Sequence, residues 1–259
     1  MKKYFAGIDS GSTMCKSVLF NGETILDTNT VKTGWNPKLS AEESLGVLLA
    51  RNNVNKNDVY VSTTGYGREA VDFADYSFTE ITCHAYGGIY LTPNIQGIID
   101  IGGQDSKVIE IKNEKVVNFF MNDKCAAGTG RFLSMACETL GLDIKDIDAF
   151  SDLSDPVSIN SMCTVFAESE IIGLLAMQTD RSKIMAGVLC SIAKKIQQQS
   201  SKLDFSENTP LLMTGGLTIS KALIDTISTT IDHEVITHKY ALHAGAIGAC
   251  ICANKKQRK

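Results

Sequence analysis

The sequence predicts an α/β protein made of two similar lobes, each with a mixed sheet flanked by helices. Two observations lead to this prediction. Strand-like segments joined by tight turns alternate with helical patterns along the whole chain. In addition, the segment at the N-terminus is repeated near residue 97, in the same strand–turn–strand–turn–strand order. The shift that aligns the two copies superposes Asp9 on Asp100, Gly11 on Gly102, Lys16 on Lys107 and Glu23 on Glu114.

The first lobe begins with a predicted strand at 4–9 and a turn at 10–13. Strands at 14–20 and 23–31 follow, and Asn21-Gly22 between them is a strong hairpin signal. A helix is expected near 40–51, opened by Ser40 with Glu43 three residues later in the capping-box pattern. A strand at 58–63, the loop Thr64–Arg68 and a helix near 83–91 complete this part.

The second lobe repeats this opening and then adds helices. Strands are expected at 97–101, 106–111 and 115–121, followed by helices at 128–140, 143–149, 167–177 and 181–202. A strand at 211–216, a helix at 218–229, a strand at 234–238 and a helix from about 242 end the chain. The predicted lobes are therefore 1–93 plus 240–259, and 94–239.

Composition excludes several functional classes. The 259 residues carry a net charge of −4, and 44% of them are hydrophobic, as expected for a globular protein with an ample core. No basic footprint argues for nucleic acid. The chain shows no signal peptide, and no apolar run approaches the roughly 18 residues of a membrane span. A cytoplasmic protein is expected.

The eight cysteines are then expected to be reduced, as is usual in that compartment. None of them forms a C-x-x-C pair, which argues against a zinc ribbon or a thioredoxin-like site. A metal site would have to combine distant cysteines, or cysteines from two chains.

Three strand ends carry glycine turns, namely Asp9–Thr13, Asp100–Asp105 and Thr214–Gly216. Such turns expose backbone N–H groups in a concave arrangement that suits phosphate oxygens, and ligands of open α/β sheets gather at this edge. Further groups around the turns can bind a nucleotide with magnesium: the hydroxyls of Ser12 and Thr13, the cation of Lys16, and the carboxylates of Asp9, Asp100 and Asp105. Gln104 is a candidate to orient an attacking water. The P-loop and Rossmann fingerprints are absent.

Two cysteines lie where helices are expected to begin. Cys125 precedes the glycine turn Gly128–Gly130 and a helical pattern, and Cys163 precedes the helix expected at 167–177. A helix N-terminus directs free N–H groups and the positive end of its dipole at such a sulfur. That environment favours the thiolate, which is the form that binds metal.

These motifs resemble known proteins. The three glycine turns resemble the phosphate and adenosine motifs of the actin/sugar-kinase/heat-shock-chaperone ATPase superfamily. Within it, Asn122–Phe132 and Cys163–Glu170 look like the (R)-2-hydroxyacyl-CoA dehydratase activators and the related benzoyl-CoA reductase ATPase subunits. Thr64–Arg68 and Cys83–Ala85 fit the same group, and the match runs from about residue 4 to 253.

The resemblance implies a duplicated actin-like ATPase fold with the nucleotide in the cleft between the lobes. It also implies a homodimer that holds one [4Fe–4S] cluster through Cys125 and Cys163 of each chain. ATP hydrolysis would drive one electron to a dehydratase or reductase partner, and a reduced ferredoxin or flavodoxin would reload the cluster. The residues expected to bind the nucleotide are Gly11, Ser12, Thr13, Lys16, Gly102, Gly103, Gly128, Thr129, Gly130, Gly215 and Gly216; those expected to act in hydrolysis, with Mg²⁺, are Asp9, Asp100, Gln104 and Asp105.

The sequence departs from the family pattern in two places. Residues 217–221 lack the asparagine that often follows the Gly-Gly turn, and Lys239-Tyr240 stands where a proline is common. Two alternatives also remain at this point. One is a small-molecule kinase of the same superfamily, with Asp100 or Asp105 as the base toward a substrate hydroxyl; the other is an ATP-regulated scaffold without metal. Arg68 and Arg131 are either functional or salt-bridging residues.

Overall fold

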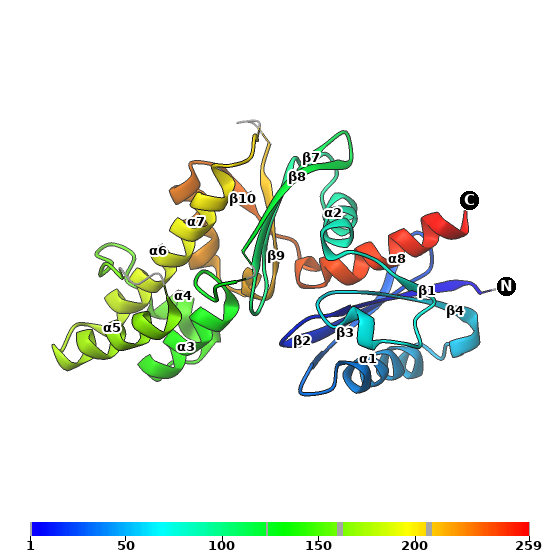
Figure 1. Ribbon diagram of the computed structural model, residues 1–259, viewed down its shortest axis with the longest axis horizontal. Helices are drawn as coiled ribbons and strands as arrows, with labels where there is room; N and C mark the ends of the chain where they lie inside the picture. Colours follow the sequence, from blue (N-terminus) through cyan, green and yellow to red (C-terminus); the bar gives the residue numbers. More distant parts are fainter. Residues whose placement is uncertain (1, 123, 160–162, 206–208, 259) are drawn as a thin grey trace. The chain divides into compact units, whose positions relative to one another are not determined.

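The computed structural model describes residues 2–122, 124–159, 163–205 and 209–258. The chain divides into two compact units. The first unit comprises Met1–Ile95, Ile111–Val117 and His238–Lys259, and the second comprises Gln96–Glu110 and Asn118–Thr237. Each unit is built around a five-stranded sheet with helices beside it (Figure 1). The predicted α/β class with two mixed sheets is confirmed.

The first unit has the strand order β3-β2-β1-β4-β5. β1 pairs with β2 in antiparallel and with β4 in parallel, so the sheet is mixed. Its strands are β1 (Tyr4–Ser10), β2 (Met14–Phe20), β3 (Ile25–Lys32), β4 (Val59–Thr64) and β5 (Tyr76–Ser77), and its α-helices are α1 (Pro37–Arg51), α2 (Glu80–Leu91) and α8 (Ala244–Gln257).

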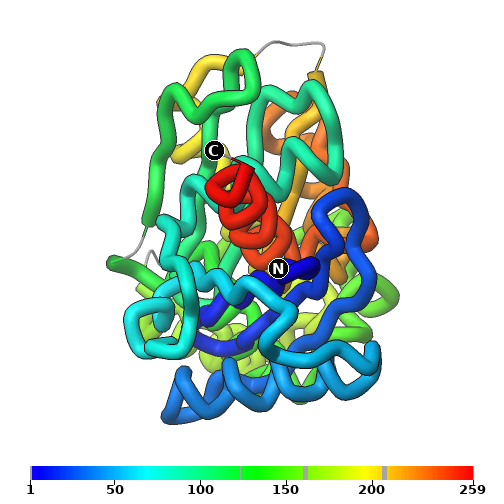
Figure 2. The backbone as a smooth tube through the Cα atoms, turned by 90° about the vertical axis from the view of Figure 1, so that its right-hand side faces the viewer, coloured from blue at the N-terminus to red at the C-terminus, as the bar shows by residue number. Residues whose placement is uncertain are grey.

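Alternation of side chains along β1 builds two cores in this unit. Ile8 packs with Leu45 of α1 on one face of the sheet. Phe5 packs with Ile247 of α8 on the other face. Both faces of the sheet are therefore covered, and β1 lies beside α8 in the tube view (Figure 2).

α2 and α8 pack backbone to backbone because glycines line their contact. A Cβ atom on Gly87 would lie 1.9 Å from the carbonyl oxygen of Ala244. One on Gly248 would lie 1.7 Å from the carbonyl oxygen of Cys83. The small residues seen in the sequence of the last helix thus serve close helix packing.

The start of α1 differs from the prediction. The side chain of Asn36 caps the helix by accepting hydrogen bonds from the backbone N–H groups of Lys38 and Leu39, and Pro37 occupies the first turn. The predicted capping box at Ser40 is wrong: Ser40 lies inside the helix, and its hydroxyl donates to the Pro37 carbonyl at 3.0 Å.

The second unit has the strand order β10-β9-β6-β7-β8, and β6 pairs in antiparallel with β7 and in parallel with β9. Its strands are β6 (Gly97–Ile101), β7 (Ser106–Lys112), β8 (Lys115–Asn122), β9 (Leu211–Gly215) and β10 (Val235–Ile236). Its α-helices are α3 (Gly130–Leu140), α4 (Ile147–Phe150), α5 (Thr164–Ala176), α6 (Arg181–Ser200) and α7 (Lys221–Ile231). Short 3-10 helices in the two units span Lys56–Asp58, Arg68–Ala70, Ile144–Asp146, Gly216–Ile219 and Ala241–His243.

The internal repeat predicted from the sequence is present in the strand pairing. β1 and β2 place Asp9 opposite Lys16, and β6 and β7 place Asp100 opposite Lys107. The order β3-β2-β1-β4-β5 in one sheet is the order β8-β7-β6-β9-β10 in the other. The two units therefore share one topology.

The core of the second unit joins its sheet to α3, α5, α6 and α7. Ile99 and Met213 of the sheet belong to the same buried cluster as Phe132 of α3, Ile171 of α5 and Leu189 of α6. α3 therefore shares one buried core with the sheet and with the other helices of this unit. Over the described residues, no helix is both long and apolar enough to cross a membrane.

Candidate functional site

The carboxyl end of β1 in the first unit carries a buried carboxylate with an open oxygen. Asp9 is 3% exposed, and its Oδ2 lies 3.4 Å from Nζ of Lys16. Its Oδ1 is buried and has no hydrogen-bond partner among the described residues, and the same holds for the hydroxyls of Ser10 and Thr63. Buried polar atoms are normally paired. Three such atoms at the ends of adjacent parallel strands fit a site for a hydrated cation or a ligand.

Glycines form the walls around Asp9. Gly65 has φ of +89°, and a Cβ atom there would lie 2.5 Å from Asp9 Oδ1. A Cβ atom on Gly245 would lie 3.1 Å from Asp9 Oδ2. The sequence did not identify these two glycines as neighbours of Asp9, although the loop that contains Gly65 was among the family motifs.

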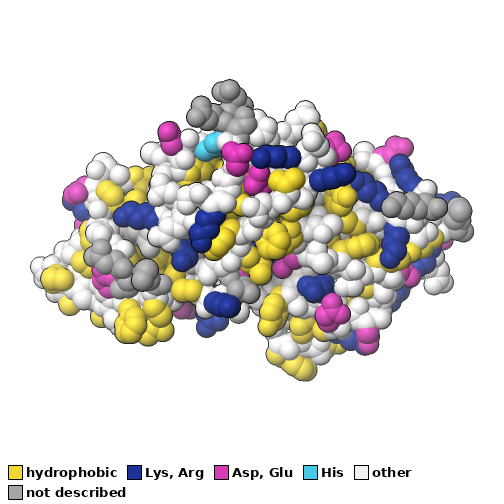
Figure 3. Space-filling model, turned by 45° about the horizontal axis from the view of Figure 1, so that its top comes forward, with side chains coloured by type: hydrophobic (Ala, Val, Ile, Leu, Met, Phe, Trp, Pro, Cys, Tyr) yellow, Lys and Arg dark blue, Asp and Glu magenta, His cyan; other side chains and the backbone are white. Residues whose placement is uncertain are grey.

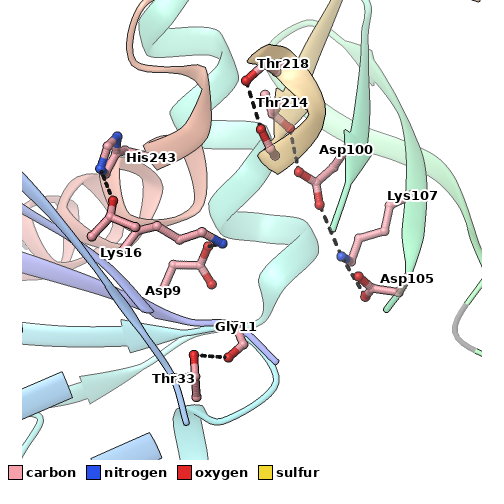
Figure 4. Close-up of polar contacts among 12 residues, drawn as sticks. Asp9, Gly11, Lys16, Thr33, Asp100, Asp105, Lys107, Thr214, Thr218 and His243 are labelled. Carbon is pink, nitrogen blue, oxygen red and sulfur yellow. Dashed lines mark hydrogen bonds and ion pairs between the residues drawn. The ribbon is translucent and has the colours of Figure 1, made fainter. Parts of the chain in front are cut away.

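The turn after β1 is fixed by a residue that the sequence did not single out. The hydroxyl of Thr33 donates to the Gly11 carbonyl at 2.7 Å, and its backbone N–H donates to the Thr13 carbonyl at 3.0 Å (Figure 4). Ser12 is half-buried and Thr13 is exposed. The predicted hydroxyls of this turn are thus accessible to a ligand.

In the second unit, a fully buried lysine holds the two predicted carboxylates. Nζ of Lys107 lies 3.2 Å from Asp100 Oδ2 and 2.8 Å from Asp105 Oδ2 (Figure 4). The hydroxyl of Thr214 on β9 donates to Asp100 Oδ1 at 2.8 Å. An isolated buried charge is costly, and here the buried Lys107 is paired with two carboxylates. The structure thus brings Asp100 and Asp105 together through Lys107, and Thr214 completes the group.

The turn that follows β6 is tight. The Gly102 N–H donates to the Asp105 carbonyl at 2.9 Å, and a Cβ atom on Gly102 would lie 2.4 Å from Asp105 Oδ1. A side chain at this position would therefore displace the carboxylate. Gln104, at the tip, is exposed and so accessible to a water or ligand.

The same turn is hydrogen-bonded to the start of α3. The N–H of Gly130 donates to the Gly102 carbonyl, and the N–H of Arg131 donates to the Gly103 carbonyl, both at 2.9 Å. Two of the four N–H groups that a helix leaves free at its start are thereby used. Gly130, predicted to bind the nucleotide, contacts the phosphate-type turn through its N–H instead.

Gly128 and Thr129, which were also predicted to bind the nucleotide, are packed inside the second unit. Gly128 has φ of +79°, and a Cβ atom there would lie 2.7 Å from Cγ of Lys195. The hydroxyl of Thr129 donates to the Ala126 carbonyl at 2.6 Å and is not a helix cap. Both residues are buried, so in this structure they shape the turn.

The two glycines after β9 differ in their surroundings. Gly215 is buried with φ of +90°, and a Cβ atom would lie 2.3 Å from the Ile101 carbonyl oxygen and 3.0 Å from Asp100 Oδ1. Gly216 is exposed, and its Cβ position is open. Gly215 therefore allows β9 to approach the Asp100 group, while Gly216 leaves space for a ligand.

Cys125 and Cys163 lie before two helices that pack against one another. Cys163 is exposed and is the N-cap residue of α5, so it sits at the positive end of that helix. Cys125 is half-buried, and the turn 126–129 separates it from α3, which begins at Gly130, two residues after the expected start at 128. Asn122 holds its loop by donating from Nδ2 to the carbonyls of Cys125, at 2.8 Å, and Ala127, at 3.3 Å.

Most of the other cysteines belong to the core. Burial raises the pKa of Cys15 to about 12 and that of Cys137 to about 11, and it raises the pKa of Cys250 further. These groups are neutral thiols at pH 7. Cys190 is half-buried in α6, and burial also raises its pKa. Cys163, by contrast, is exposed and Cys125 is half-buried, so the sulfurs of both predicted ligands are accessible.

The geometry agrees with what sequence comparison finds. The model of the BadF/BadG/BcrA/BcrD ATPase family matches residues 6–253. The chain belongs to this family. It is therefore an ATPase, in keeping with the glycine turns and carboxylates described above.

Individual members of the family are similar over their whole length. The (R)-2-hydroxyglutaryl-CoA dehydratase activating ATPase of Acidaminococcus fermentans is 36% identical over 263 residues, which cover 100% of both chains. The structure of the activator of 2-hydroxyisocaproyl-CoA dehydratase from Clostridium difficile with bound ADPNP matches with a TM-score of 0.91 and 35% identity. This match covers 98% of this chain and 96% of that chain.

A more distant likeness concerns the fold alone. A ROK family protein from Streptococcus pneumoniae matches with a TM-score of 0.54 and 12% identity, over 98% of this chain and 99% of that chain. The actin-like ATPase fold expected from the sequence is confirmed by these matches.

Proposed function

We propose that this ATPase is an activator that passes single electrons at low potential to a 2-hydroxyacyl-CoA dehydratase or a related acyl-CoA reductase. The observation that carries the proposal is the direct hydrogen bonding between the glycine turn after β6 and α3, the helix that follows Cys125. The relatives named as dehydratase activators support the same activity. The cytoplasmic location expected from the sequence is part of this proposal.

The nucleotide is proposed to bind at the glycine turns that end the strands. Gly11, Ser12, Thr13 and Lys16 would bind phosphate oxygens, together with Gly102, Gly103, Gly215 and Gly216. Asp9 fits a hydrated Mg²⁺ because its buried Oδ1 has no partner among the described residues. Asp100 and Asp105 are proposed to act with Lys107 as one charged group, and Gln104 to orient the attacking water.

Cys125 and Cys163 fit a [4Fe–4S] cluster as donors, since thiolates are its usual ligands and four are needed. Bound there, the cluster would supply one-electron chemistry at low potential. Each chain offers two accessible cysteines of this kind, so the complete site requires a second copy of the chain. We therefore propose a homodimer, reloaded by a reduced ferredoxin or flavodoxin.

An apolar face on α5 supports the homodimer. Val165, Phe166, Ile172 and Met177 are between 53% and 72% exposed, although they belong to the helix that begins at Cys163 or to its C-cap. Figure 3 shows hydrophobic side chains gathered at the left end of the view, where α5 lies. Several exposed apolar side chains on one helix are typical of an interaction surface.

The hydrogen bonds at the start of α3 provide the coupling. A change in the turn 102–105 on ATP hydrolysis is transmitted to Gly130 and Arg131 without any intervening side chain. Since α3 packs on α5 in the core of the second unit, both cysteine-bearing segments respond to the same turn. Movement of these helices is the proposed link between hydrolysis and electron transfer.

Iron analysis after anaerobic reconstitution tests the proposal. Wild-type protein should be brown, with about four irons per dimer, and should hydrolyse ATP. Cys125→Ala and Cys163→Ala should each lose the iron and keep ATP binding, whereas Cys190→Ala, at a half-buried cysteine of α6, should retain it. Colourless, iron-free wild-type protein would refute the activator. Transfer of phosphate from ATP to an added hydroxyl acceptor would instead establish the kinase alternative.

A further inference from the structure

A cavity of about 310 Å³ lies in the second unit between the end of β8 and the C-terminal half of α6. Its volume is at the lower end of the range for small-molecule sites. None of the described residues that line the cavity belongs to the glycine turns that are proposed to bind ATP. Among the residues that line it are Phe120, Asn122, Lys124, Lys195, Gln199 and Lys202.

The charge around the cavity has a single sign. Lys124, Lys195 and Lys202 line it, and no acidic residue is among the described residues that do so. Lys195, Gln199 and Lys202 lie on one face of α6 and its extension, because residues three and four apart are neighbours on a helix. Three ammonium groups at one cavity repel one another, and a bound anion removes this repulsion.

Two of the three lysines are held in place. The stem of Lys195 lies against Gly128, where a Cβ atom would come within 2.7 Å of Lys195 Cγ. Nζ of Lys202 lies 3.8 Å from the centre of the Phe120 ring, in a cation–π contact. Less conformational freedom is therefore lost when these side chains bind a ligand.

A buried amide in the cavity wall has an unused polar atom. Gln199 is 1% exposed, and its Nε2 donates to the hydroxyl of Ser106 at 2.7 Å. Its Oε1 is buried without a hydrogen-bond partner among the described residues. Since a serine hydroxyl can donate or accept, the amide can present either its oxygen or its NH₂ group to a ligand. Because buried polar atoms in native proteins normally have a hydrogen-bond partner, we expect a ligand to supply one for this amide.

We infer that this cavity binds a small anion that carries one or two phosphate groups. Lysine ammonium groups bind phosphate as point charges, and the NH₂ group of Gln199 can add a neutral hydrogen bond. Asn122, which lines the cavity, holds the loop of Cys125 through the carbonyls of Cys125 and Ala127. The ligand therefore contacts a residue that fixes this loop. The inference does not depend on the proposed iron–sulfur function, since the site is complete in one chain.

Acetylation of lysines by an amine-specific reagent, read by mass spectrometry residue by residue, tests the site with inorganic pyrophosphate as the probe. Pyrophosphate should slow the acetylation of Lys195 and Lys202 several-fold relative to sodium chloride of equal ionic strength. Lys194, which is exposed on the same helix and does not line the cavity, is the internal control. The experiment is run with and without saturating ADP and Mg²⁺, and the protection should be the same in both.

Calorimetry on variants gives a second measurement. With ADP and Mg²⁺ present, the double variant Lys195→Gln/Lys202→Gln should bind pyrophosphate at least about tenfold more weakly, because two charge-assisted contacts are lost. Lys194→Gln should bind as the wild type does. Equal protection of Lys194, no protection at all, or protection by poly-glutamate alone would overturn the inference; the last result would indicate a docking surface for an acidic protein.

Discussion

Lys16 and Lys107 occupy equivalent positions in the two sheets, each opposite an aspartate near the end of the neighbouring strand. Nζ of Lys16 lies 3.4 Å from Asp9, and Nζ of Lys107 lies 3.2 Å from Asp100. Their surroundings differ, because the side chain of Lys16 is 14% exposed and that of Lys107 is fully buried. Lys16 thus retains the access that a phosphate-binding cation needs, whereas Lys107 is enclosed with its carboxylates.

Replacing Lys107 with methionine should strongly destabilise the second unit. The change leaves Asp100 and Asp105 without their cation, and breaking a buried ion pair by removing one partner costs about 3–5 kcal/mol. Urea unfolding measures the loss. The matched control is Lys145→Met, which removes an exposed lysine 3.1 Å from Asp143 and should leave stability nearly unchanged. Equal effects of the two variants would contradict the role assigned to Lys107.

The two adjacent glycines at the end of β9, Gly215 and Gly216, should respond differently to substitution by alanine. Gly215→Ala places a Cβ atom at positive φ and against the Ile101 carbonyl, so it should cost about 1–3 kcal/mol from backbone strain alone. Gly216→Ala enters open space and should be nearly neutral. Unfolding of both variants without nucleotide checks this, and a stable Gly215→Ala protein would show that the turn can relax.

Two substitutions at Arg131 distinguish the role of its backbone N–H from that of its side chain. Arg131→Pro removes the N–H that donates to Gly103, in the first helical turn where proline is tolerated. Arg131→Ala keeps it. In iron-depleted protein, the alkylation rate of Cys125 should differ between ADP and a non-hydrolysable ATP analogue for wild type and Arg131→Ala. For Arg131→Pro this difference should shrink markedly; an undiminished difference would exclude the route through this hydrogen bond.

His243 should make the stability of the first unit depend on pH. Burial, with the charge of Lys16 adding to it and that of Asp9 opposing it, lowers the pKa of His243 to about 4, and its Nε2 lies 3.0 Å from the hydroxyl of Thr30. The unfolded state therefore binds a proton between about pH 6.5 and 4 that the folded state does not, so stability falls as the pH falls. From these pKa values the loss at pH 5 is about 2 kcal/mol.

The variant His243→Gln isolates this effect, because glutamine does not titrate. Urea unfolding at pH 7 and pH 5 should show a smaller loss of stability for the variant than for the wild type. If both proteins lost the same stability between these two pH values, His243 would not be the group responsible.

Signals that are local in the chain were sufficient for much of the fold. The hairpin at Asn21-Gly22 predicted β2 with its observed bounds, and the pattern around Asp100 predicted β6 in the same way. The predicted starts of two helices differ from the observed ones. α5 begins at Thr164 and not at 167, and α1 begins at Pro37, although Asn36 and Pro37 carried the correct capping signal and the pattern at Ser40 competed with it.

The arrangement of the site depended on contacts between distant residues, which spacing does not reveal. Thr214 reaches Asp100 across 114 positions in the sequence. Gly245 lies beside Asp9 only because α8 packs on β1. The burial of Lys107 likewise follows from the packing of the second unit, since the same residue type at the equivalent position, Lys16, is partly exposed.

The placement of α8 sets the order in which the chain can fold during synthesis. The first unit takes its opening strands from residues 4–64, yet α8, at 244–257, supplies one of its cores. Domains usually fold as they leave the ribosome, beginning at the N-terminus. The second unit is therefore translated completely before α8, the helix that the first unit still lacks. The opening strands of the first unit stay without this helix, and accessible to chaperones, until α8 has been translated.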